Sequence, residues 1–197
     1  AIWALPVLLA ITLHEAAHGY VARHFGDPTA DLAGRITLNP LRHIDPVGTV
    51  LVPAGILALS ALAGSGGILF GWAKPVPVNF SRLRNPKADM LWVAAAGPFT
   101  NLVMAVMWSM LGSFAAGSGG SYSLAMMKMA DAGVQINAVL MLLNLLPIPP
   151  LDGGRIAVSL LPDRLAWRYA RLEPYGFPIL LVLLFTGILG SILWPMI

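Results

Sequence analysis

The chain has 197 residues, of which 57% are hydrophobic and 11% charged, and its formal net charge is +3. A soluble domain has about a quarter charged residues and disorder requires low hydrophobicity, so the composition excludes both a soluble globular protein and a disordered one. The absence of cysteine excludes disulfides, thiolate metal sites and cysteine nucleophiles, and the modest excess of Lys and Arg is typical of cytoplasmic loops of a membrane protein rather than of nucleic-acid binding.

Four long apolar segments predict membrane-spanning helices, because a span needs about 20 mainly apolar residues. They are residues 2–22, 90–112, 133–150 and 175–197. No stretch between them has the composition of an interdomain linker, so we predict one integral-membrane domain over residues 1–197. The chain starts at Ala1 without Met, and we expect its natural N-terminal segment to be missing.

Residues 46–70 are also apolar and long enough to cross a membrane, but proline and glycine interrupt them. If they span, the loops on the two sides of the membrane hold 8 and 4 Lys or Arg residues; if they enter and return, the loops hold 11 and 1. Basic residues gather on the cytoplasmic side of membrane proteins. We therefore predict a re-entrant segment beside the functional site, with both ends of the chain outside.

Two short extended stretches flank this segment. Residues 35–38 alternate in polarity, and residues 72–78 contain two prolines, which restrict them to an edge strand or irregular chain. Residues 163–173 mix Arg with Trp, Tyr and Leu, as amphipathic helices at a membrane surface do. The predicted fold is an all-α polytopic membrane protein with about four spanning helices, a re-entrant segment and a small membrane-associated β-sheet near the site.

An HExxH motif, His14-Glu15-Ala16-Ala17-His18, lies inside the first predicted span. Residues four apart share a helix face, so both imidazoles point to one place, as zinc ligands do, with the glutamate placed to act on water. Ionisable residues within an apolar span indicate function by default. The alternative is a buried polar network that joins helices.

A catalytic zinc site typically has three protein ligands, and without cysteine the third must be His, Asp or Glu. Asp152 follows the third predicted span, after prolines that break the helix and before Gly153 and Gly154, which allow a tight turn. Spacing alone leaves open whether Asp152 binds zinc or only caps the next helix. The remaining histidines are His24 and His43.

Together these motifs resemble the site-2 protease family of intramembrane zinc metalloproteases, in its short branch without a PDZ domain. The resemblance covers about residues 10–160. It is carried by the HExxH motif, by Ala96-Gly97-Pro98 with Asn101, by residues 144–154, and by residues 26–30, 38–49 and 71–79 in the order of that branch.

The resemblance implies a membrane metalloendopeptidase that cuts transmembrane proteins, with one Zn²⁺ bound by His14, His18 and Asp152. It places a multi-pass protein in the cell membrane, and the basic loops put its active site toward the cytoplasmic side. The partners it implies are a transmembrane protein substrate and the lipid bilayer, with no nucleic acid; a homodimer is permitted.

Roles for further residues follow from the same resemblance. Glu15 acts as the general base toward water and later as the acid toward the leaving amine. Asn144 binds the substrate backbone or stabilises the oxyanion, and Asn101 is a weaker candidate for this work. An unwound substrate pairs with an edge strand, whose residues are Lys74, Pro75, Val76 and Pro77.

Three points stay open at the level of the sequence. His43 is either a solvated loop residue or a group that binds zinc in a resting state or contacts substrate. A catalytically inactive membrane scaffold of the same fold is the alternative function, although the intact Glu15 argues against it. A metal transporter is disfavoured because residues 90–112 and 175–197 contain no ionisable side chain.

Overall fold

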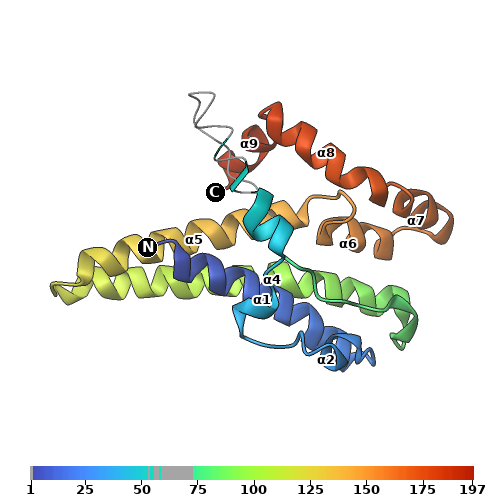
Figure 1. The fold of residues 1–197 in the computed structure, drawn as a ribbon, viewed down its shortest axis with the longest axis horizontal. Coiled ribbons are helices and arrows are strands. Elements are labelled where there is room, and N and C mark those ends of the chain that lie inside the picture. Colours follow the sequence, from blue (N-terminus) through green and yellow to red (C-terminus); the bar gives the residue numbers. More distant parts are fainter. Residues whose placement is uncertain (1, 53, 56–57, 59–72) are drawn as a thin grey trace.

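The computed structural model describes residues 2–52, 54–55, 58 and 73–197, and within them the chain is helical (Figure 1). The α-helices are α1 (Ala4–His24), α2 (Thr29–Leu32), α4 (Pro86–Ser118), α5 (Ser123–Leu145), α6 (Asp152–Leu160), α7 (Asp163–Ala170), α8 (Glu173–Phe185) and α9 (Ile188–Leu193). Shorter helical turns cover Pro40–Arg42, Pro46–Leu51, Phe80–Arg82 and Trp194–Met196.

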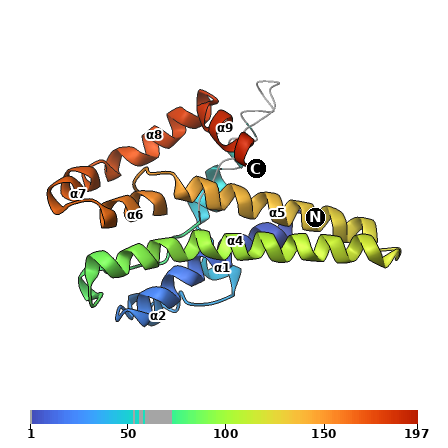
Figure 2. The ribbon, with the colours of Figure 1, turned by 180° about the vertical axis from the view of Figure 1, so that it is seen from behind.

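The long helices α4 and α5 run antiparallel and side by side, and α1 packs along α4 (Figures 1 and 2). Small residues allow this approach: a Cβ added at Gly133 of α5 would lie 2.3 Å from the Trp108 ring of α4. Trp108 packs there with Met104 and Ala130. Helix α6 packs against the N-terminal half of α4, and α4 also packs against α1. Helix α4 therefore lies in contact with both α1 and α6.

Two of the described helices, α4 and α5, are long and apolar enough to cross a membrane by length and composition. Helices α8 and α9 form a third candidate if the pair is one span. Helix α1 matches the predicted segment 2–22 but is not among these candidates, since His14, Glu15, His18 and Arg23 make it more polar. The prediction of about four spans therefore stays a prediction.

The predicted boundaries of two spans were wrong. Helix α5 begins at Ser123 rather than near 133, because the Met, Ala and Lys residues before 133 are good helix formers. It ends at Leu145 rather than 150, since Pro147 cannot continue it. The last predicted span is bent by 82° between α8 and α9, where Gly187 adopts a left-handed φ of 76°.

The small sheet is not found among the described residues. Residues 73–79 are extended but irregular, which is the alternative that their prolines allow, and residues 36–38 form bends. Most of the predicted re-entrant segment 46–70 lies outside the described residues; its first part, Pro46–Leu51, is a wide helical turn capped by Asp45. Of the predicted interfacial helix 163–173, Asp163–Ala170 forms α7, and the guanidinium of Arg171 just after it stacks on Trp167 at 3.6 Å. Its place at a membrane surface stays a prediction.

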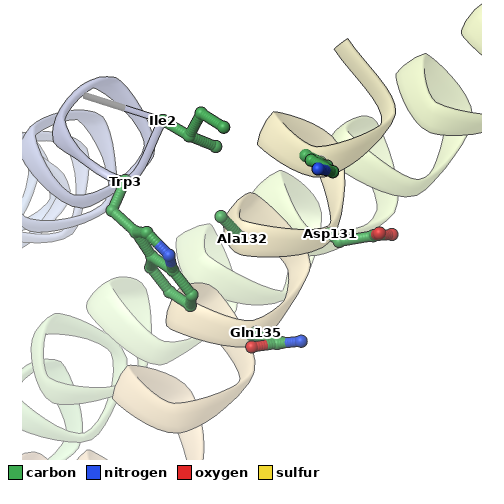
Figure 3. A pocket seen from close by; sticks show the side chains of 6 residues that line it. Ile2, Trp3, Asp131, Ala132 and Gln135 are labelled. Atoms are coloured by element: carbon green, nitrogen blue, oxygen red, sulfur yellow. The ribbon is translucent and has the colours of Figure 1, made fainter. Parts of the chain in front are cut away.

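A hollow of about 570 Å³ lies where the start of α1 meets α5 (Figure 3). Trp3 points into it, and Asp131 and Gln135 lie on the α5 side. It lies more than two helical turns from the HExxH residues along α1, so it is separate from the predicted site.

Candidate metal centre

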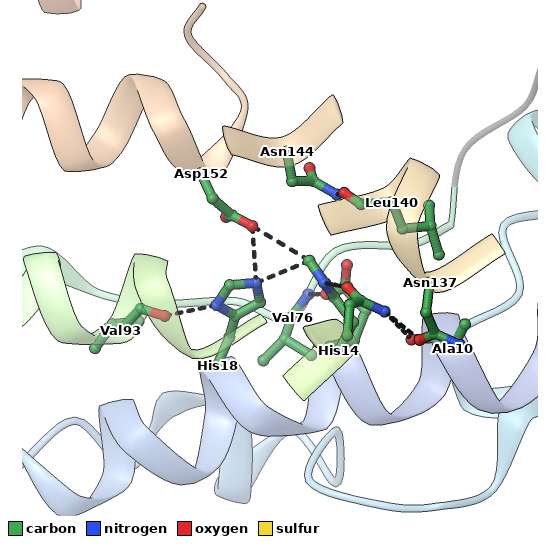
Figure 4. A network of polar contacts seen from close by, with 11 residues as sticks. Ala10, His14, His18, Val76, Val93, Asn137, Leu140, Asn144 and Asp152 are labelled. Carbon is green, nitrogen blue, oxygen red and sulfur yellow. Dashed lines mark hydrogen bonds and ion pairs between the residues drawn. The ribbon is translucent and has the colours of Figure 1, made fainter. Parts of the chain in front are cut away.

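Two histidine side chains project from one face of α1 (Figure 4). His14 and His18 are both buried. The Nδ1 atom of His18 lies 2.7 Å from the carbonyl oxygen of Val93, and the Nδ1 atom of His14 lies 2.5 Å from Oδ1 of Asn101. Both oxygens can only accept, so each neutral ring carries its proton on Nδ1 and presents the lone pair of Nε2.

Asp152, the first residue of α6, reaches the same place from the other side. The loop between α5 and α6 brings it there. A Cβ added at Gly153 would lie 2.3 Å from the carbonyl oxygen of Leu145, and one at Gly154 would lie 2.5 Å from the nitrogen of Pro149. Both glycines are helical, so their role is to let α6 approach this loop closely, not to form the tight turn that the sequence predicted.

The three side chains form a nearly equilateral triangle of ligand atoms. Nε2 of His14 and Nε2 of His18 are 3.1 Å apart, and Oδ2 of Asp152 lies 3.2 and 3.3 Å from them. All three atoms carry lone pairs, and Oδ2 of Asp152 is buried without a hydrogen-bond donor in the described part of the chain. Ligand atoms of tetrahedral zinc, with bonds of about 2.0–2.1 Å, lie about 3.3 Å apart. The residues present therefore fit Zn²⁺.

Gly97 of α4 closes one side of this triangle. A Cβ at Gly97 would lie 2.4 Å from Nε2 of His18 and 2.6 Å from Nε2 of His14, so the site requires glycine here. A carboxylate binds a metal in its ionised form, so Asp152 would add one negative charge beside the two neutral rings.

Glu15 is held by an extended segment of the chain. Its Oε2 atom accepts a hydrogen bond from the backbone N–H of Val76 at 2.7 Å. The segment 73–79 that carries this N–H is itself anchored, because the guanidinium of Arg35 donates to the carbonyl oxygen of Lys74 at 2.7 Å. One oxygen of the Glu15 carboxylate is thus oriented by the backbone.

Asn101 takes part in a network of hydrogen bonds behind His14, and the substrate contact predicted for it stays a prediction. Its Oδ1 accepts from His14, and its Nδ2 donates to Oδ1 of Asn137 at 2.9 Å and to the carbonyl oxygen of Ala10 at 3.4 Å. Asn101 and Asn137 are both 0% exposed. Asn101 therefore orients a metal-facing histidine from behind. Asn137 was missed by sequence reasoning, although a polar amide within an apolar helix was a signal for it.

Asn144 lies on the last turn of α5, beside Asp152 in Figure 4. Its Nδ2 donates to the carbonyl oxygen of Leu140 at 3.0 Å, which uses one of its two N–H donors. Asn144 thus keeps hydrogen-bonding capacity that its own helix does not use, and its predicted contact with substrate stays a prediction.

His43 is 2% exposed, so the interpretation as a solvated loop residue was wrong. Its Nε2 lies 3.1 Å from the carbonyl oxygen of Thr37, and its own carbonyl oxygen accepts from the N–H of Lys74 at 2.9 Å. The described His and acidic side chains that share a metal-sized site are those of the triangle, without His43. A contact of His43 with zinc or substrate stays a prediction.

Asp27, in the turn after α1, anchors the far end of the 73–79 segment. Its Oδ1 accepts from the backbone N–H of Thr29 at 3.0 Å and from the Thr29 hydroxyl, and its Oδ2 accepts from the N–H of Asn79 at 2.6 Å. Burial alone would raise the pKa of Asp27, but the hydrogen bonds from Thr29 and Asn79 hold this pKa below its ordinary value of 3.8.

We expect Asp27→Asn to lower the free energy of unfolding by about 1–3 kcal/mol, since an amide cannot accept both sets of hydrogen bonds. Because the folded-state pKa is depressed, this stabilisation is complete above pH 3.8 and is lost as the pH falls through the folded-state pKa. Thermal unfolding in detergent at pH 7 measures the loss. The control is Asp31→Asn, which removes a partly exposed ion pair with Arg23 worth about 0–1 kcal/mol; equal losses in the two variants would contradict the anchor.

Known proteins match this chain over nearly its whole length. Residues 118–187 match the model of peptidase family M50. The chain is 39% identical over 201 residues to "Putative zinc metalloprotease YwhC" of Bacillus subtilis, which covers 98% of this chain and 84% of that protein. It is 33% identical to "Putative zinc metalloprotease Rip2" of Mycolicibacterium smegmatis, over 93% of this chain and 66% of that protein.

A protein with the same name, Rip2, from Mycobacterium tuberculosis is 28% identical over 87% of this chain and 56% of that protein. The chain thus spans about two thirds or less of the mycobacterial relatives. No solved structure gives a significant match.

The alignment with YwhC covers nearly the whole chain, and therefore the segments that carry the triangle of metal-facing atoms. The family match, the likeness to YwhC, the triangle of ligand atoms and the candidate membrane spans together show that the protein is a membrane metalloendopeptidase with Zn²⁺ as its cofactor. The chain belongs to peptidase family M50, the site-2 protease family of zinc metalloproteases.

Proposed function

We propose that this chain is an intramembrane endopeptidase that hydrolyses peptide bonds of transmembrane substrate proteins. The observation that carries the proposal is the position of the metal-facing triangle against α4, a helix able to cross a membrane. Gly97, which touches both histidines, lies about 16 Å along α4 from Pro86. A site at that depth serves a substrate within the bilayer better than one in water.

The chemistry divides between the metal and the chain. Bound Zn²⁺ lowers the pKa of water to about 7 and polarises a carbonyl group. Glu15, held through Oε2 by Val76, takes the proton of the attacking water with its other oxygen and later gives it to the leaving amine. Asn144 offers an N–H donor and an amide oxygen to the substrate backbone near the bond that breaks.

Substrate binding by strand addition involves Lys74, Pro75, Val76 and Pro77. The two prolines have no N–H, the N–H of Lys74 donates to His43, and that of Val76 donates to Glu15. A substrate that pairs through Val76 must therefore replace Glu15 as the acceptor. In this proposal a substrate peptide that pairs with Val76 also frees Oε2 of Glu15. Both carboxylate oxygens therefore become available when an unwound peptide is present.

The proposed setting is the cell membrane, crossed several times by one domain, with the site toward the cytoplasmic side. Basic residues support this orientation: Arg155 and Arg164 follow Asp152 closely in the chain, and Lys87 at the start of α4 forms an ion pair with Asp163 of α7 at 2.7 Å. These residues lie on α6, α7 and the start of α4, which are at the same end of the molecule (Figure 2).

The test compares purified, zinc-loaded protein on two substrates: a tagged single-span protein, and the same protein without its span. We expect cleavage of the first only. An inactive scaffold of the same fold, the alternative function, would bind zinc and cut neither across a panel of single-span proteins. Cleavage of both substrates at the same bond outside the span would overturn the intramembrane proposal while leaving the metalloprotease assignment intact.

A further inference from the structure

A chain of hydrogen bonds connects three helices to the metal centre (Figure 4). His14 on α1 donates from Nδ1 to Oδ1 of Asn101 on α4, at 2.5 Å. Asn101 donates from Nδ2 to Oδ1 of Asn137 on α5, at 2.9 Å. Asn137 in turn donates from Nδ2 to the carbonyl oxygen of Gly133, one turn back on its own helix, at 2.8 Å. The three side chains are 6%, 0% and 0% exposed, so water does not replace any of these bonds.

The direction of this chain is fixed at its far end. The carbonyl oxygen of Gly133 can only accept, so Asn137 must turn its NH₂ group toward Gly133 and its oxygen toward Asn101. Asn101 must then turn its NH₂ group toward Asn137 and its oxygen toward His14. His14 is thereby required to carry its proton on Nδ1, which leaves Nε2 as a lone pair facing the other two ligands.

Without Asn137 this order is lost. An asparagine side chain has nearly the same shape after a 180° rotation about its amide, which exchanges oxygen and NH₂. The remaining acceptor for Asn101 is the carbonyl oxygen of Ala10, at 3.4 Å near the limit of a hydrogen bond. A rotated Asn101 would offer a donor to Nδ1 of His14 and favour the tautomer with its proton on Nε2, which leaves no lone pair on Nε2 for a metal.

We propose that Asn137 is a positioning residue of the zinc site, which acts through Asn101 to set the tautomer of His14. It contacts neither metal nor substrate. The inference concerns metal binding by the family's zinc site and does not depend on which substrate is cut. Outer-shell partners of metal-binding histidines typically contribute 10- to 100-fold in metal affinity.

The first test is Asn137→Leu, which removes both hydrogen bonds at similar size. We expect zinc affinity, measured by competition with a chelator, to fall about tenfold, at the lower end of the range for outer-shell partners. In zinc-free protein with ¹⁵N-labelled histidine, the His14 resonances should shift from the Nδ1–H tautomer toward the Nε2–H tautomer. The control is Gln135→Leu, which removes an exposed amide from the same helix and should change neither measurement.

A second variant separates positioning from folding. In Asn101→Asp the carboxylate accepts from Nδ1 of His14 in either orientation, so nothing is left for Asn137 to orient. We expect Asn137→Leu to shift the His14 ¹⁵N signals toward the Nε2–H tautomer in the wild type and to leave the Nδ1–H tautomer in place in the Asn101→Asp background. The same ¹⁵N shift in both backgrounds, or unchanged zinc affinity and unchanged ¹⁵N signals in Asn137→Leu, would overturn the proposal.

Discussion

Glu15→Gln is expected to lower the rate of substrate cleavage by about 10²–10⁴-fold, the usual contribution of a general base, while zinc stays bound. The zinc triangle does not include Glu15. Glutamine keeps an oxygen that accepts from the N–H of Val76, so the 73–79 segment stays anchored and only the basicity of the side chain is lost. Initial cleavage rates and zinc content, both measured on the same preparation, check the result.

The matched control is Glu173→Gln, which makes the same chemical change at the exposed start of α8. It should leave both rate and zinc content at the wild-type level. A Glu15→Gln variant that holds zinc and cuts at more than about a tenth of the wild-type rate would remove Glu15 from the role of general base.

Asp152→Asn is expected to weaken zinc binding by more than about 100-fold, beyond the effect of outer-shell partners, and to abolish cleavage with it. The carboxylate supplies the one negative charge of the triangle and closes it at 3.2 and 3.3 Å. Asparagine has nearly the same size, so the loop and the packing of Gly153 and Gly154 should stay in place. Chelator competition measures the affinity, and thermal unfolding of the zinc-free protein reports on the fold.

Asp163→Asn serves as its control because Asp163 is also the first residue of a helix, α7, and carries the same charge near a helix N-terminus. Its ion pair with Lys87 is exposed, so the variant should bind zinc as the wild type does. Equal zinc affinity of Asp152→Asn and wild type would mean that the third ligand lies elsewhere.

The sequence was sufficient to locate the segments that meet at the site. The geometry of the i, i+4 histidine pair follows from helix periodicity. The pattern around Asp152 left its role open, and the resemblance to the family assigned it to zinc. The structure brings His14, His18 and Asp152 together, although 134 residues separate the last two. That closure depends on the contact of α6 with α4, which no local pattern encodes.

The supporting residues were harder to predict because their roles depend on neighbours distant in sequence. Asn101 was a weaker candidate for substrate contact through its motif, and its hydrogen bonds to His14 and Asn137 were not foreseen. Asp27 was noticed only as part of a motif, and its function emerges from the N–H of Asn79, 52 residues later. The predicted helix ends were wrong at two places. At Ser123 the helix propensity of the residues that follow was overlooked, and at Gly187 a single glycine bends the predicted span.

The measurement that tests the central claim most directly is the position of the cut. A single-span protein, with tags on both sides, is placed in liposomes with zinc-loaded protein, and the fragment ends are determined by mass spectrometry. The account predicts one or a few cuts inside the apolar span or at its cytoplasmic edge, and none with Glu15→Gln. Cuts confined to the water-exposed parts of the substrate, or cuts that persist at the wild-type rate with Glu15→Gln, would contradict it.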